Sequence, residues 1–161
     1  MSTLQQSAIG ATTTATGRIR GWWAPLVAPP SPVSTVLCLV GGVLLVVSSV
    51  IHLHLWSTGY RHIPTIGPLF LLQGIVGIVL ALLVGVTRRV WAALLGALFA
   101  ASTIGGLLLS VEVGLFGFKD SLSAPDATLS LVVESAALVV LAAAVLLGSH
   151  RTHAVGSRLP A

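Results

Sequence analysis

Residues 51–73 read IHLHLWSTGYRHIPTIGPLFLLQ and connect two long apolar runs. We call this stretch the polar seam, because it holds three of the five histidines, His52, His54 and His62, together with Gln73. The flanking residues are mostly Leu, Val, Ala and Gly. Two apolar runs joined by a short polar connection predict a helical hairpin in a membrane.

The composition supports a membrane protein. The 161 residues are 55% hydrophobic and 7% charged, with a mean hydropathy of +1.03. A soluble fold of this size would leave much of that apolar surface in water. The formal charge of +4 is spread in ones and twos at the ends of apolar runs, which predicts the lipid bilayer as a partner and not nucleic acid. Cys38 is the single cysteine, so an intrachain disulfide is excluded.

Four apolar runs have about the 20 residues needed to cross the hydrocarbon. The predicted spans are 34–56, 65–87, 90–112 and 127–149. We expect Pro29, Pro30 and Pro32 to prevent a helix before Ser34, which would then be the N-cap. Residues 1–33 are predicted to be a disordered or interfacial cytoplasmic tail, and residues 150–161 a basic cytoplasmic tail. The predicted fold is an all-α, four-transmembrane-helix bundle.

Basic residues predict the orientation. With four spans, both termini lie on one side of the membrane, and Arg61 and Lys119 lie on the other. Six arginines share the side of the termini: Arg18, Arg20, Arg88, Arg89, Arg151 and Arg158. The positive-inside rule therefore predicts a multi-pass plasma-membrane protein with both termini in the cytoplasm and the polar seam at the outer face.

The two predicted hairpins show a weak internal similarity. An offset of 58 residues aligns HLHLWSTGYR with SVEVGLFGFK and pairs His54 with Glu112 and Gly59 with Gly117. Two hairpins of like orientation would be parallel repeats about an axis along the membrane normal. The alternative is that all transmembrane hairpins share apolar spans, interfacial aromatic residues and flanking cations. Both interpretations stay open at this stage.

Small residues recur at a spacing of four along the second and third spans. Such stripes allow close approach of helix backbones in lipid, where apolar side chains alone give little preference for protein over lipid. The predicted packing residues are Gly77, Ala81 and Gly85 in the second span and Ala93, Ala97, Ala101 and Gly105 in the third. They would pack within the chain or in a homo-oligomer.

Four polar side chains are predicted to lie in the outer third of the membrane: His52, Gln73, Glu112 and Glu134. Glu134 is the most informative, because a carboxyl group inside the hydrocarbon must be protonated or partnered. One interpretation is a ligand- or proton-binding site at the centre of the bundle. The other is a structural clamp, in which Gln73 and His52 satisfy the carboxyl group and set the register of the helices.

Other chemistry has little support in the sequence. A metal site would need His54, His62 and Glu112 to fold together, a weak alternative because no ligand spacing favours it. His52 and His54 point to different faces of one helix. Catalytic motifs such as a phosphate-binding loop or a nucleophile elbow are absent from the sequence, so we predict no catalytic residues and no cofactor.

The run HLHLWSTGYRHIPTIGPLFLLQ resembles a segment of small four-span integral membrane proteins of actinobacteria, over about Ile51 to Gly77. The resemblance implies a four-helix protein of an actinobacterial plasma membrane, and it carries no activity with it. Together with the residues above, it predicts a non-enzymatic structural or accessory membrane subunit, in a larger membrane complex or a homo-oligomer. The alternative is a small carrier or binding protein with a polar site in the outer third of the membrane.

Overall fold

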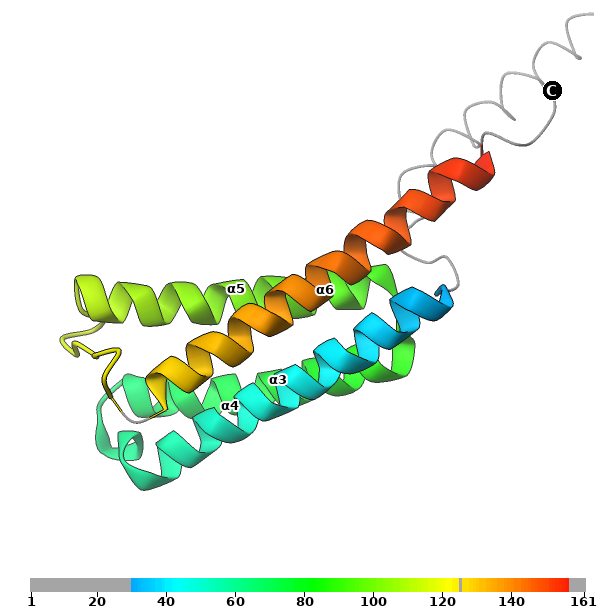
Figure 1. Cartoon of the computed structure of the whole chain (residues 1–161). Helices are drawn as coiled ribbons and strands as arrows, with labels where there is room; N and C mark the ends of the chain where they lie inside the picture. Colours follow the sequence, from blue (N-terminus) through cyan, green and yellow to red (C-terminus); the bar gives the residue numbers. More distant parts are fainter. Residues whose placement is uncertain (1–29, 125, 157–161) are drawn as a thin grey trace, which may run out of the picture.

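The computed structural model describes residues 30–124 and 126–156, with side chains up to residue 149. Four long helices account for most of this part of the chain (Figure 1). They are α3 (Pro32–Thr58), α4 (Ile66–Thr87), α5 (Val90–Glu112) and α6 (Ala127–Gly156), with a short 3-10 helix, η1 (Tyr60–His62), between α3 and α4. The predicted all-α four-helix bundle is confirmed.

Each of the four helices is long and apolar enough to cross a membrane. The side chains that face outward are large and apolar, including Val43, Leu82 and Val139, each more than half exposed. In water this surface would be unfavourable, but lipid tails solvate it without cost. The chain is therefore a multi-pass membrane protein.

The start of α3 corrects one expectation. The helix begins at Pro32, two residues before the predicted N-cap Ser34, and the N-cap is Ser31. The Ser31 hydroxyl accepts a hydrogen bond from the backbone N–H of Ser34 at 3.1 Å. Proline is tolerated in a first helical turn because its missing N–H would have no partner there, so Pro32 starts the helix instead of blocking it.

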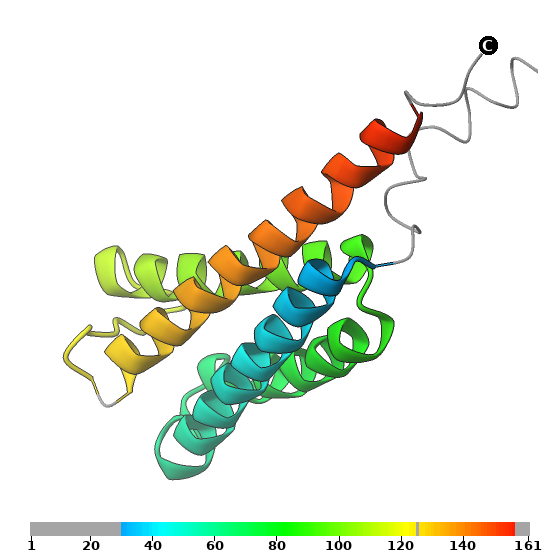
Figure 2. The same cartoon turned by 45° about the vertical axis from the view of Figure 1, so that its right-hand side comes forward.

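The structure describes part of the predicted C-terminal tail, but not the N-terminal tail as far as residue 29. At the C-terminus, α6 continues to Gly156 and extends beyond the other helices (Figures 1 and 2). The predicted basic tail from residue 150 therefore starts as helix. The predicted N-terminal tail lies outside the described residues as far as residue 29.

The core lies where α6 crosses the other helices obliquely (Figure 1). Leu45 of α3, Val84 of α4 and Leu141 of α6 are almost completely buried there. Gly96 of α5 faces all three, because a Cβ atom on it would lie 2.9 Å from Leu141, 3.2 Å from Leu45 and 3.4 Å from Val84. The small residue at this position is what allows four helices to meet.

The small-residue stripe of α4 is in close contact with α3 over part of its length. Gly77 and Ala81 are buried, and a Cβ atom on Gly77 would overlap the hydroxyl of Ser49 on α3. A Cβ atom on Gly42 of α3 would lie 3.3 Å from the carbonyl oxygen of Ala81. The same Cβ atom on Gly42 would lie 3.9 Å from the backbone nitrogen of Gly85, whereas a Cβ atom on Gly85 would meet nothing within 4 Å, so Gly85 does not point its hydrogen side at α3.

The small-residue stripe of α5 is buried in its first half and open in its second half. Ala93 and Ala97 are buried, whereas Ala101 is exposed and Gly105 has no atom within 4 Å of an added Cβ. A strict spacing of four drifts around a helix with 3.6 residues per turn, and the buried face continues through Ala100 instead. Beyond Ala100, a cavity separates α5 from α4.

Candidate functional site

The carboxyl group of Glu134 is the centre of a polar cluster inside the bundle. The residue is 2% exposed, and its Oε1 atom accepts hydrogen bonds from three side chains. The donors are the Ser48 hydroxyl at 3.1 Å, the Ser130 hydroxyl at 3.3 Å and the Gln73 amide nitrogen at 3.3 Å. These bonds link α3, α4 and α6, so a group that is unfavourable in lipid is satisfied by its neighbours.

His52 is the fourth neighbour of this carboxyl group. Its Nδ1 atom lies 2.8 Å from the carbonyl oxygen of Ser48, which only accepts hydrogen bonds, so Nδ1 must carry a hydrogen. Its other ring nitrogen, Nε2, lies 3.7 Å from Oε1 of Glu134. This distance is longer than that of a hydrogen bond.

A cavity of about 350 Å³ adjoins the cluster and is lined by His52, Gln73 and Glu134. Most of its wall is apolar and comes from α4 and α5, with contributions from α3, α6, η1 and the loop that follows α5. Its volume is in the range of small-molecule sites, and such sites combine an apolar wall with a few polar groups.

The second carboxyl oxygen of Glu134, Oε2, is one polar atom in the cavity wall that a ligand could contact. Every hydrogen bond and ion pair that the described residues make with Glu134 uses Oε1, and none uses Oε2. All buried side-chain nitrogen and oxygen atoms in the described residues have a partner, so Oε2 keeps some accessible surface. Because Glu134 lines the cavity, we infer that this surface faces the cavity.

Aromatic side chains from the polar seam and from the loop after α5 form part of the cavity wall. The ring of Tyr60 stacks on Phe70 at 4.5 Å between centroids and meets Phe118 edge to face at 5.8 Å. Phe70 also lies 5.3 Å from the His52 ring. Such aromatic contacts add stability beyond the burial of area and hold the η1 segment and the loop after α5 against α4.

Tyr60 also links the cavity wall to a second carboxyl group. Burial raises the pKa of the Tyr60 hydroxyl, and the neighbouring Asp120 carboxylate raises it further by its negative charge and by accepting the hydroxyl's hydrogen bond. The neutral phenol is thus favoured in the folded protein. Its contribution to stability is complete below the ordinary pKa of 10.0 and is lost as the pH rises through the higher pKa of the folded state.

This gives a direct titration experiment, because Tyr60 is the only tyrosine in the chain. We expect the ultraviolet absorbance of the phenolate to appear above the ordinary pKa of 10.0. In Asp120→Asn the transition should move down toward that value without reaching it, since burial is the larger cause. A wild-type transition at or below 10.0 would contradict this arrangement.

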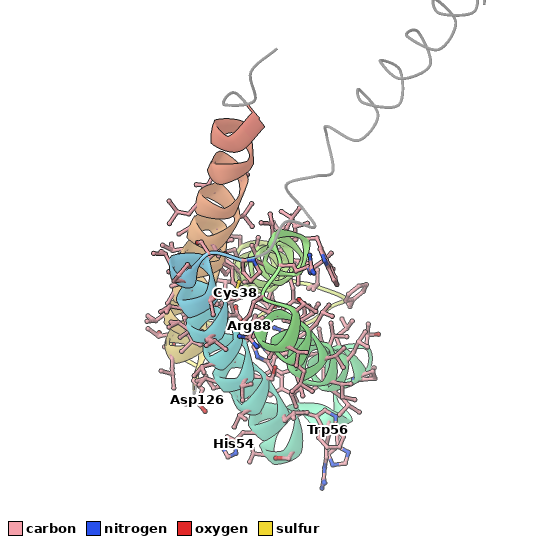
Figure 3. All side chains as sticks on the ribbon, turned by 90° about the vertical axis from the view of Figure 1, so that its right-hand side faces the viewer. Cys38, His54, Trp56, Arg88 and Asp126 are labelled. Carbon is pink, nitrogen blue, oxygen red and sulfur yellow. The ribbon has the colours of Figure 1, made fainter. Side chains whose placement is uncertain are left out.

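The other predicted ligands lie away from the cavity. Glu112, predicted with the polar cluster, is exposed as the last residue of α5 and is not part of the cavity wall. His54 is exposed on the outside of α3 (Figure 3), and His62 accepts a hydrogen bond from Arg61 Nε at 2.9 Å. Among the described side chains, those of residues 30–124 and 126–149, no three from His, Cys, Asp or Glu are grouped to hold a metal ion.

Several residues of the site were not predicted. Ser48 and His52 are four apart on α3, and Ser130 and Glu134 are four apart on α6, so each pair shares a helix face. That spacing would have been a usable signal for the two serines. Tyr60 and Asp120 lie in connecting segments, where no periodicity indicates which residues will face the cavity.

Comparisons with protein-family models, curated proteins and solved structures found no match for this chain.

Proposed function

We propose that this membrane protein binds a small, mostly apolar molecule in the cavity beside Glu134. The observation that carries the proposal is an apolar space of about 350 Å³ with a buried carboxyl group in its wall. A carboxyl group needed only to join helices would be expected in a closed, packed environment. Here the same residue lines a space of ligand size and leaves one oxygen without a hydrogen bond from the described residues.

A structural or accessory subunit is the second candidate. It is supported by the hydrogen bonds that Glu134 makes to α3, α4 and within α6. Interhelical hydrogen bonds of this kind contribute about 0.6–2 kcal/mol each. The clamp and the binding site are compatible, because the clamp uses Oε1 and a ligand would use Oε2.

The proposed location is the plasma membrane of an actinobacterium, with both termini in the cytoplasm. The arginine distribution and the resemblance of residues 51–77 support it. Arg88 and Arg89 join α4 to α5 at the end of the bundle opposite the cavity. With this end in the cytoplasm, the cavity would lie in the outer half of the membrane. Labelling of a cysteine introduced in that turn with a membrane-impermeant reagent tests it: labelling of intact cells would overturn the orientation.

Blocking the cavity tests the binding proposal. Gly106 lines the cavity, and a Cβ atom on it would meet nothing within 4 Å, so Gly106→Leu should fill the space without disturbing the helices. We expect wild-type protein extracted from its native membranes to carry a bound small molecule and Gly106→Leu to lose it. Native mass spectrometry, followed by small-molecule analysis of the denatured sample, measures both.

The neighbouring glycine supplies a matched control. Gly105 also has open space around an added Cβ, but it is not part of the cavity wall. Gly105→Leu should therefore retain the bound molecule. Two results would favour the accessory subunit over a binding protein. One is equal occupancy by the bound molecule in Gly105→Leu and Gly106→Leu. The other is a wild-type protein that carries no small molecule but still purifies with a protein partner.

A further inference from the structure

The charged groups around the cavity are acidic. The titratable residues in its wall are His52 from α3, Tyr60 from η1, Asp120 from the loop after α5 and Glu134 from α6. The lining residues of α4 and α5 include no titratable side chain, and the wall of this cavity, as the described residues form it, includes no Lys or Arg. Arg61 and Lys119 are exposed and lie outside it. The electrostatics therefore favour a cation and disfavour an anion.

The aromatic residues favour the same kind of ligand. Tyr60, Phe70, Phe99 and Phe118 all line the cavity. The faces of aromatic rings attract cations, and quaternary ammonium groups are recognised by sets of such rings because they lack hydrogen-bond donors. An apolar wall with aromatic rings and a carboxylate matches an organic cation better than it matches a small hydrated ion.

The cavity also reaches the lipid-facing surface of the bundle. Two of its lining residues on α4, Leu69 and Leu72, are 38% and 56% exposed, and Ser102 on α5 is exposed as well. The cavity therefore approaches the outside of the bundle between α4 and α5. In a membrane this surface faces lipid, so a ligand dissolved in the bilayer can enter from the side.

The carboxyl group of Glu134 gives such a cation a partner. Its Oε1 atom accepts the hydrogen bonds from Ser48, Gln73 and Ser130, so Oε2 remains for the cation.

We propose that the cavity takes a lipophilic organic cation, such as a quaternary ammonium compound, at the Glu134 carboxyl group among these aromatic rings. This inference rests on the proposed binding function and defines its ligand class.

A pair of probes that differ only in charge tests it. Benzyltrimethylammonium and neopentylbenzene have nearly the same shape, with a positive nitrogen in the first replaced by carbon in the second. Calorimetric titration of the wild-type protein in lipid nanodiscs should show tighter binding of the cation, by at least about tenfold.

Two variants separate the possible outcomes. Glu134→Gln keeps the shape and a hydrogen-bond acceptor, so it should lose the preference for the cation while still binding neopentylbenzene. Gly106→Leu should bind neither probe. Equal binding of both probes to the wild type would overturn the cation inference and leave the binding function standing. Binding of neither probe, with no co-purified molecule, would overturn both. The comparison of probes on the wild type holds even if Glu134→Gln does not fold.

Discussion

Gly96→Leu is expected to destabilise the folded bundle by about 1–3 kcal/mol, the usual cost of overpacking a well-filled core. A Cβ atom on Gly96 would lie within 3.4 Å of Leu45, Val84 and Leu141, which come from the three other helices. The remaining leucine atoms would have no free volume, because these three neighbours are almost fully buried. Unfolding in mixed micelles with increasing denaturing detergent, followed by circular dichroism, measures the loss.

The same substitution on the same helix provides the control. Gly105→Leu introduces an identical side chain where an added Cβ has no atom within 4 Å. Its stability should be equal to that of the wild type or slightly higher, since glycine is a poor helix former. Equal losses in Gly96→Leu and Gly105→Leu would show that the crossing of four helices at Gly96 is not as described.

The second large effect is expected at the connection between α3 and α4. A Cβ atom on Gly67 would lie 2.7 Å from the backbone carbonyl oxygens of both Tyr60 and Arg61. Backbone atoms do not move aside as flexible side chains do, so Gly67→Ala must displace η1 from the first turn of α4. We expect a loss of about 1–3 kcal/mol in the same unfolding measurement.

Displacement of η1 should also be visible at Tyr60, because this residue belongs to η1 and forms the hydrogen bond to Asp120. In Gly67→Ala the phenolate titration should shift back toward the ordinary pKa of 10.0. Gly59 is the matched control at the other end of the connection: its φ is −152° and an added Cβ meets nothing within 4 Å. A Gly59→Ala loss as large as that of Gly67→Ala would contradict the tight packing at Gly67.

The polar cluster shows how far reasoning from residue types goes. Glu134 could be singled out because an isolated carboxyl group in hydrocarbon is unfavourable without partners. His52 and Gln73 were chosen from their similar depth, and the structure brings both to Glu134. Glu112 was chosen on the same ground and lies apart, because depth along a helix says nothing about which direction the side chain faces.

The preference for a binding function arose only from the arrangement of the helices. By sequence alone, the predicted clamp and the predicted binding site share His52, Gln73 and Glu134, and these residues do not distinguish the two. The difference lies in the space beside Oε2 of Glu134, which depends on how α4 and α5 separate beyond Ala100. No residue type in those helices signals a cavity, since Leu107 and Val76 would serve equally well in a packed core.

The sequence by itself determined that the chain has four helices able to cross a membrane, and it singled out Glu134 as a carboxyl group that needs partners. These properties follow from the length and hydropathy of single segments, which are sums over neighbouring residues and need no partner. The tertiary structure alone decided that Glu134 bonds through one oxygen, that aromatic rings line the adjoining space, and that Gly96 marks the crossing of four helices. These features depend on the rotation and crossing of each helix, which are set by side-chain packing between segments distant in the sequence.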